Sequence, residues 1–333
     1  MRKTLQRLIR RENLTSSECE DALHYIINSD DSIKASAFLV LLSAKGETAE
    51  EIYGIANVMK SQMIKVKTNH DVMDIVGTGG DGMHTFNIST ASALIAASCG
   101  IKIAKHGNRA VSSLCGSADF IEGLKIDINK TPDQASESID RDNFAFLYAP
   151  NYHPAMAKIA PVRRALGIPT CFNIIGPLLN PASAKYMMIG VFKEDLLDVM
   201  ADVLLMFKVR KAIIYHGCGT DELTTCGTSR AIFISDTEKL STWINPDHYG
   251  FKKSSINNLK GGSVDLNVNI FKDTLKGKTS ATTDSLLLNA AFMLMLYGSV
   301  KNVEDGLIFA HNCIASGTAE QFIKRLSTTY QQS

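Results

Sequence analysis

A short apolar segment that runs into a polar, glycine-bearing loop recurs along the chain, and this recurrence constrains the fold more than any other feature. At residues 74–76 the segment leads into Gly77, a glycine-rich loop and a helix of small residues at 90–99. Three further segments follow the same plan, at residues 101–104, 144–148 and 212–215. Strands that alternate with helices predict an α/β fold with a mostly parallel sheet and helices on both faces. Ligands of such sheets bind at the carboxyl ends of the strands, where these polar loops lie.

The first 65 residues have helical spacing almost throughout. Thr15-Ser-Ser-Glu and Thr48-Ala-Glu-Glu have the form of capping boxes that begin helices. We therefore expect a small α-helical domain at residues 1–66 and a larger α/β domain at residues 67–333. Pro and Gly interrupt an apolar stretch around residues 160–182, which predicts a helical excursion back toward the first domain.

Charge and composition exclude several classes of function. The chain has 333 residues with 35 basic and 34 acidic side chains, and a net charge of +1 is unlike the basic surface of a nucleic-acid or anionic-membrane binder. No apolar run reaches the roughly 18 residues of a membrane helix, and the basic first residues lack the apolar region of a signal peptide. The seven cysteines form no paired motif and are expected to be reduced. We therefore expect a cytoplasmic protein without nucleic-acid or membrane partners.

The glycine-rich loop is the first candidate ligand site. It reads Gly77-Thr-Gly-Gly80-Asp81, and it is followed by Thr85, Asn87, Ser89 and Thr90 at the start of a helix. Glycines let backbone amides point at an anion, the helix N-terminus adds partial positive charge, and the short side chains suit phosphate or ribose oxygens. The motif is neither a Walker loop nor the dinucleotide fingerprint. A capped glycine turn without a ligand is the alternative interpretation.

The second candidate is the polar loop that follows the next strand. It reads Lys105-His106-Gly107-Asn108-Arg109, and Ser117 begins a further helix nearby. Two cations at the end of a buried strand indicate an anionic ligand, because burying them without a partner is costly. The alternatives are a solvated basic turn for the loop and simple helix capping for Ser117.

The third candidate is the adjacent acid pair Asp221-Glu222 in a glycine-bearing loop. Two carboxylates opposite a phosphate-binding loop suit Mg²⁺, which takes oxygen ligands and often completes its coordination with substrate phosphates. Adjacent acids on an ordinary surface turn are the alternative interpretation.

The fourth candidate is the pair Arg163-Arg164. A guanidinium is the side chain best suited to hold a carboxylate through two bonds. Neighbours on a helix point about 100° apart, so we expect at most one of the two to face the site.

Taken together, these loops resemble the anthranilate phosphoribosyltransferase family. The resemblance runs from KGETAEEI through DIVGTGGDGMHTFNIST, KHGNRAVSSLCGSAD, HPAMAKIAPVRRALGIPTCFNIIGPLLNP and TDELT to LLLNAAFMLMLYG. It implies a helical domain joined by a hinge to an α/β domain of the nucleoside-phosphorylase-like kind, and a homodimer formed through the helical domains. It also implies an enzyme, a pentosyltransferase of tryptophan biosynthesis, that joins anthranilate to phosphoribosyl pyrophosphate and releases pyrophosphate.

The family's site residues transfer to this chain position by position. The resemblance implies Mg²⁺ ligands at Ser89, Asp221 and Glu222, and anthranilate contacts at Gly77, Asn108 and Arg163. No residue is assigned as catalytic. The implied phosphoribosyl pyrophosphate site comprises Gly77, Gly80, Asp81, Thr85, Asn87, Ile88, Ser89, Thr90, Lys105, His106, Gly107, Asn108, Arg109, Ala110, Val111, Ser112, Ser113 and Ser117.

Two departures from the family pattern stand out. Lys125 occupies a position where the family usually has Gly, and the acidic loop reads Gly-Cys-Gly-Thr-Asp-Glu instead of the commoner Gly-x-Asp-Gly-x-Asp-Glu. Two other functions remain as alternatives. A pyrimidine nucleoside phosphorylase shares the architecture but needs no acid pair for a metal. A non-catalytic paralogue that binds nucleic acid would be strongly basic, whereas this chain is neutral.

Overall fold

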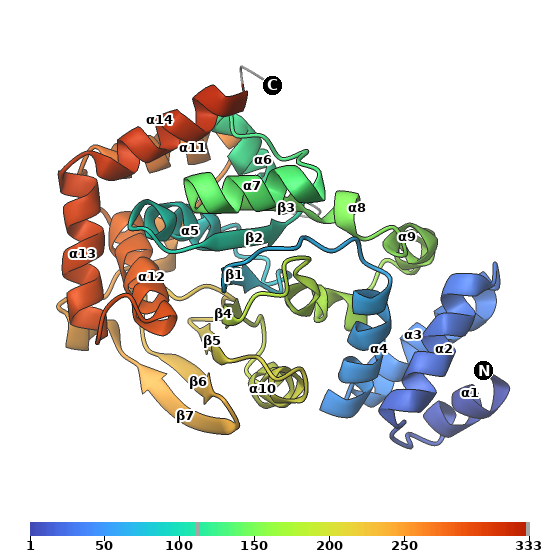
Figure 1. The fold of residues 1–333 in the computed structure, drawn as a ribbon. Helices are drawn as coiled ribbons and strands as arrows, with labels where there is room; N and C mark the ends of the chain where they lie inside the picture. Colours follow the sequence, from blue (N-terminus) through green and yellow to red (C-terminus); the bar gives the residue numbers. More distant parts are fainter. Residues whose placement is uncertain (111–113, 331–333) are drawn as a thin grey trace.

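A bundle of four helices forms the N-terminal part of the chain in the computed structural model, which describes residues 1–110 and 114–330, with side chains to residue 328. The bundle is blue in Figure 1. Both predicted capping boxes are present, with Thr15 and Thr48 each accepting a hydrogen bond from the backbone amide three residues on. The predicted helical region is confirmed. Its helices are α1 (Arg2–Ile9), α2 (Ser16–Asn28), α3 (Ser32–Lys45) and α4 (Ala49–Ser61).

A seven-stranded sheet forms the centre of the rest of the molecule, in the order β3-β2-β1-β4-β5-β6-β7. The first five strands are parallel to their neighbours, and the last two pair antiparallel. The predicted α/β class with a mostly parallel sheet is confirmed. The strands are β1 (Met73–Gly77), β2 (Ile103–Gly107), β3 (Phe144–Tyr148), β4 (Tyr186–Gly190), β5 (Lys211–Gly217), β6 (Ser229–Ser235) and β7 (Glu238–Ile244).

Helices cover both faces of the sheet, because successive strand residues point to opposite sides. Ile103 and Met188 belong to one buried cluster, and the neighbouring Ala104 and Met187 belong to another. The first cluster is covered by α5 (Ile88–Ser98), α6 (Ser117–Gly123), α11 (Val264–Leu275), α12 (Ala281–Tyr297), α13 (Val303–Ala315) and α14 (Thr318–Tyr330). The second is covered by α7 (Pro132–Asp142), α8 (Ala149–Tyr152), α9 (Met156–Leu166) and α10 (Leu196–Met206).

The N-terminal bundle shares its core with one face of the sheet. Phe38 of α3 and Ile55 of α4 lie in the same buried cluster as Ile189 of β4. The segment predicted as a helical excursion, residues 160–182, contains most of α9 and two 3₁₀ turns, and it contacts α2, α3 and α4. The domain limits at residues 66 and 67 stay a prediction, since the packing is continuous across them.

Two sequence expectations differ from the structure. The strand expected at residues 101–104 begins two residues later and extends to Gly107, because it pairs in register with β3 from Ile103 to Gly107. The hairpin of β6 and β7 was not predicted; its turn contains Asp236, which adopts a left-handed φ of 53°. Short 3₁₀ turns complete the described chain: η1 (Cys171–Asn173), η2 (Gly176–Leu179), η3 (Pro246–Tyr249) and η4 (Ile256–Leu259).

No helix in the part of the chain that the structure describes is both long and apolar enough to cross a membrane.

Candidate active site

The loop after β5 lies directly against the ends of β1 and β4. The amide of Gly79 donates a hydrogen bond of 2.6 Å to Oδ2 of Asp221. A Cβ atom at Gly77 would overlap the same oxygen, and one at Gly190 would overlap the Asp221 carbonyl oxygen. Both positions therefore require glycine, because any side chain would displace the acid pair. The structure thus brings the glycine-rich loop and Asp221 together at the carboxyl edge of the sheet.

The acid pair is not neutralised by a salt bridge in the described chain. Within the described chain, no Lys, Arg or His lies within salt-bridge distance of Asp221 or Glu222. Glu222 directs its carboxylate to α5, where Oε2 accepts a 2.6 Å hydrogen bond from Oγ of Ser89. Burial, followed by the charge of Asp81, raises the pKa of Asp221 to about 7. Burial and the charge of Asp221 raise the pKa of Glu222 to about 8. Ionising both groups is therefore unfavourable unless a positive charge binds beside them.

The donors at this position fit a hard divalent cation. They are the two carboxylates of Asp221 and Glu222 and the hydroxyl of Ser89, with the buried Oδ2 of Asp81 lacking any hydrogen-bond partner nearby. Oxygen ligands of this kind suit Mg²⁺. The described residues contain no group of three or more His, Cys, Asp or Glu that could form a complete metal cage. A cation here would therefore need further oxygens from water or a phosphate.

Lys105 lies inside β2, not in a loop, which corrects the sequence interpretation. Its side chain is buried, and Nζ donates to the carbonyl oxygen of His106 at 2.9 Å. Burial lowers the pKa of Lys105, while the charges of Asp74 and Glu222 act in the opposite direction. Burying an ammonium group that forms no salt bridge costs free energy, and an anion bound beside it would lower that cost. The strand reaches this far because parallel pairing with β3 continues to Gly107.

Behind Lys105, a buried network that the sequence did not reveal fixes the strand. Asp74 of β1 accepts a 2.7 Å hydrogen bond from Nδ2 of Asn180 and a 3.3 Å bond from the amide of His106. The ring of His106 contacts that of His153, with their Nε2 atoms 3.1 Å apart. Burial lowers the pKa of both rings, that of His153 to about 4, so the two are neutral and one donates to the other. The only sequence signal was a charged Asp74 within an apolar strand.

The loop that follows β2 is held by its own hydrogen bonds. Oγ of Ser117 accepts from the amide of Asn108 and donates to its carbonyl oxygen, both at 3.1 Å. Arg109 forms ion pairs of 2.9 and 2.8 Å with Asp119 and Glu122, so its charge is already compensated. The amide of Ala110 donates to Asp119. Val111, Ser112 and Ser113, which were also predicted to bind the substrate, lie outside the described residues.

The remaining predicted residues lie at the start of α5 and just before it. Gly80 adopts a positive φ of 86° in the glycine-rich loop, and Thr85 forms an isolated bridge with Lys260. Asn87 precedes the first turn, and its Nδ2 donates to the carbonyl oxygen of Cys115 at 3.2 Å, which joins the two candidate loops. Ile88 and Thr90 are buried in that turn with Ser89.

The two arginines of α9 differ in their surroundings. Arg163 is partly buried, its guanidinium lies 5.5 Å from the ring centroid of Phe172, and Nη2 donates to Asn173 at 3.4 Å. Burial lowers the pKa of Arg163, and no acidic residue of the described chain pairs with it. Arg164 is exposed. Arg163 is therefore the one that is free to hold an anionic ligand.

Comparison with known proteins identifies the family to which these loops belong. Residues 2–63 match the helical bundle domain of a glycosyl transferase family, and residues 69–320 match its a/b domain. The anthranilate phosphoribosyltransferase of Chlamydia felis is 39% identical over 329 residues, which are 98% of this chain and 96% of the relative. The chain belongs to the anthranilate phosphoribosyltransferase family. The predicted family and the predicted enzyme class are confirmed.

Solved structures of the family have the same fold. The anthranilate phosphoribosyltransferase of Thermus thermophilus superposes with a TM-score of 0.91 at 34% identity, covering 98% of this chain and 99% of that chain. The Saccharomyces cerevisiae enzyme in complex with PRPP (phosphoribosyl pyrophosphate) and Mg gives a TM-score of 0.91 at 28% identity, with coverage of 99% and 98%. The same yeast enzyme in complex with 4-fluoroanthranilate gives 0.89 at 27% identity, with coverage of 99% and 97%.

The two departures from the family pattern fall on strained backbone. Lys125, where anthranilate phosphoribosyltransferases usually have Gly, adopts a left-handed φ of 62°. Cys218 and Gly219, in the loop before the acid pair, have φ values of 55° and 73°. A non-glycine residue is disfavoured in this region, so the family glycine at position 125 has a conformational reason.

Proposed function

We propose that this chain transfers the phosphoribosyl group of phosphoribosyl pyrophosphate to the amine of anthranilate, which yields N-(5-phosphoribosyl)anthranilate and pyrophosphate in tryptophan biosynthesis. The observation that carries this proposal is the acid pair Asp221-Glu222, which lies against the glycine-rich loop and forms no salt bridge within the described chain. Such a pair is favourable only when a cation binds with it, and the adjoining loop suits the phosphates that would share that cation. The substrates named for the yeast enzyme support the same assignment.

Asp221, Glu222 and Ser89 would hold Mg²⁺. When bound, Mg²⁺ neutralises the charge of the diphosphate and makes pyrophosphate a better leaving group. Asp81, whose Oδ2 has no partner, would orient ligands around the metal.

The glycine-rich loop and the start of α5 would bind the sugar diphosphate. The start of α5 lies beside the acid pair, since the amide of Ser89 donates to Oε1 of Glu222 at 3.3 Å. The partial positive charge of this helix N-terminus would favour an anionic group there. Lys105 would supply a full positive charge to the departing pyrophosphate. Departure leaves positive charge on the ribosyl carbon, as in other glycosyl transfers.

Arg163 would hold the carboxylate of anthranilate, and Asn108 would contact its amine side. The aromatic amine is neutral near pH 7, so no strong general base is required, and positioning and electrostatics account for the rate. The neutral pair His106 and His153 would position β2 without exchanging protons with the substrate. Gly77 keeps space open beside the acid loop.

One fluorescence experiment tests the reaction. We expect the purified protein, mixed with anthranilate, phosphoribosyl pyrophosphate and Mg²⁺, to cause the anthranilate fluorescence to disappear, and chelation of Mg²⁺ with EDTA to stop the loss. Circular dichroism shows whether the protein is folded in each assay. Folded protein that consumes no anthranilate but cleaves uridine with inorganic phosphate would instead identify a pyrimidine nucleoside phosphorylase.

We further propose a cytoplasmic homodimer formed through the helical bundle. Ile9 of α1 and Ile33 of α3 are 66% and 81% exposed, and apolar side chains of this kind favour burial in an interface. None of the seven cysteines, all in the described chain, forms a disulfide bond, as is usual in the cytoplasm. Light scattering should give twice the chain mass of 36.3 kDa, and Ile33→Glu should lower it to that of one chain.

A further inference from the structure

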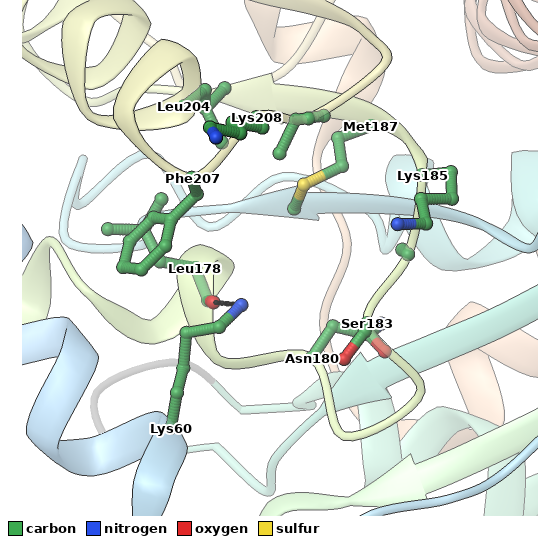
Figure 2. Close-up of a pocket in the computed structure, with 11 residues that line it drawn as sticks. Lys60, Leu178, Asn180, Ser183, Lys185, Met187, Leu204, Phe207 and Lys208 are labelled. Carbon is green, nitrogen blue, oxygen red and sulfur yellow. Dashed lines mark hydrogen bonds between the residues drawn. The ribbon is translucent and has the colours of Figure 1, made fainter.

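A second pocket lies at the opposite edge of the sheet from the acid pair. It has a volume of about 200 Å³ and opens between the amino ends of β4 and β5, the end of α10 and the bundle helix α4 (Figure 2). None of the residues assigned to the reaction lines it. It is therefore separate from the proposed active site and independent of the proposed function.

Three lysines surround this pocket from different elements. Lys60 comes from α4, Lys185 precedes β4 and Lys208 follows α10, and Figure 2 shows the ammonium groups of Lys60 and Lys185 directed toward the space between them. No acidic residue lines the pocket, and none in the described part of the chain forms a salt bridge with any of the three. Like charges gathered without a counter-charge favour the binding of an anion.

Lys60 occupies the most enclosed position of the three. It is partly buried, whereas Lys185 and Lys208 are exposed at the rim. Its Nζ lies 3.4 Å from the carbonyl oxygen of Leu178 and 4.7 Å from the ring centroid of Phe207. Burial, followed by the charges of Lys65 and Lys185, lowers the pKa of Lys60. A bound anion would offset both effects.

Part of the remaining wall is apolar, and part is fixed by hydrogen bonds. Leu178, Met187 and Leu204 are buried side chains on its wall, so a ligand that fits must also present an apolar body. Asn180 is fixed in the wall by hydrogen bonds from Nδ2 to Asp74 at 2.7 Å and to the carbonyl oxygen of Ala104 at 2.8 Å. A wall held in this way requires little ordering when a ligand binds.

We propose that this pocket binds a small organic anion, whose carboxylate or phosphate head contacts Lys60, Lys185 and Lys208 and whose apolar body lies on Leu178 and Phe207. The cavity volume limits the ligand to a few carbon atoms beyond the head. Because Lys60 belongs to the bundle and the other contacts to the α/β part, the anion bridges the two parts of the molecule.

Isothermal titration calorimetry with three six-carbon probes tests the proposal. We expect hexanoate or hexyl phosphate to bind saturably, with one molecule per chain, and neutral 1-hexanol to bind at least about 10-fold more weakly because it lacks the charge. The tighter of the two anions identifies the preferred head. Failure of both anions to saturate the folded protein, or equal binding of 1-hexanol, would overturn the proposal.

Substitutions of the pocket lysines test whether the anion binds at this site. Lys60→Gln combined with Lys185→Gln should weaken the binding of the anion at least about 10-fold. Lys301→Gln, which removes an exposed lysine outside the lining, should leave its affinity unchanged. Near-ultraviolet circular dichroism checks that the double variant is folded. Arg163→Ala should also leave the anion's affinity unchanged. Binding that is lost in Arg163→Ala but kept in the double lysine variant would place the anion in the active site and overturn the proposal.

Discussion

Two buried acidic sites in this molecule have opposite surroundings. Glu51 in the helical bundle is fully buried, and its carboxylate accepts hydrogen bonds from Nζ of Lys45 at 2.9 Å and from the amides of Leu14 and Thr48 at 2.8 Å. Asp221 is buried and Glu222 is partly buried beside it, and neither forms a salt bridge within the described chain. The first carboxylate is compensated by the protein itself, whereas the second site leaves negative charge for something else to neutralise.

This difference separates a structural acid from a functional one. Glu51 joins the loop before α2 to the end of α3 and the start of α4 by accepting from two backbone amides and one lysine, so its removal should cost stability. The acid pair lowers the stability of the fold when no cation is bound. Groups that lower stability in this way are typical of sites where binding or catalysis requires them. The predictions that follow test this distinction, from the largest expected effect to the smallest.

The largest effect is expected for Glu51→Ala. Removing this carboxylate leaves the ammonium group of Lys45 without its counter-charge and two amides without partners, and we expect the free energy of unfolding to fall by about 3–5 kcal/mol. Urea denaturation measures the change. The control is Glu50→Ala, since Glu50 is exposed and makes only a 3.3 Å bond to the amide of Ser16; its effect should stay below about 1 kcal/mol. Equal losses in the two variants would contradict the structural role of Glu51.

Replacement of the acid pair should lower activity without lowering stability, the opposite of the effect expected for Glu51→Ala. In Asp221→Asn with Glu222→Gln we expect kcat/KM to fall at least about 100-fold, because the metal-dependent neutralisation of the diphosphate is lost. The melting temperature without Mg²⁺ should not fall, since mutual repulsion is removed. Asp236→Asn, at an exposed turn, is the control for both measurements. Turnover and Mg²⁺ dependence that remain unchanged would show that the pair is not the metal site.

Arg163→Ala should produce a selective kinetic effect. Loss of a charge-assisted bond to the carboxylate should raise the KM for anthranilate about 10- to 100-fold and change the KM for phosphoribosyl pyrophosphate far less. Arg164→Ala, the exposed neighbour, should alter neither constant. If both KM values rose equally in Arg163→Ala, the arginine would not be the carboxylate contact.

The smallest effect is expected at Lys125. Because its φ of 62° disfavours a side chain, Lys125→Gly should raise the free energy of unfolding by about 0.5–1 kcal/mol, after the entropic cost of glycine is counted. Lys276→Gly is the matched control, since Lys276 has a φ of −85° and should lose stability when replaced. Thermal denaturation distinguishes the two, and a loss in both variants would rule out strain at position 125.

Local signals in the sequence were sufficient for much of the fold. The capping boxes at Thr15 and Thr48 depend only on residues within one helical turn, so they could be predicted correctly. Glycines followed by a helix likewise predicted the loop between β1 and α5. The end of β2 could not be placed in this way, because it is set by pairing with β3, some 40 residues away.

The parts of the site that escaped prediction depend on long-range contacts. Asn180 reaches Asp74 across 106 positions of sequence, and His153 reaches His106 across 47. Neither pair has a local motif, since only the folded chain brings their buried polar atoms together. The hairpin of β6 and β7 was missed for a related reason. Its turn at Asp236 lacks the Asn-Gly or Asp-Gly signal that would have identified it.

The core that the bundle shares with one face of the sheet limits how this molecule can move. Phe38 and Ile55 are packed in the same cluster as Ile189, so the bundle cannot swing away without exposing apolar surface. Any closure over the substrates must therefore occur as small sliding displacements between packed helices, such as α4 against α10. Unfolding of the bundle should likewise disrupt the sheet face that it covers, because the two share one buried cluster.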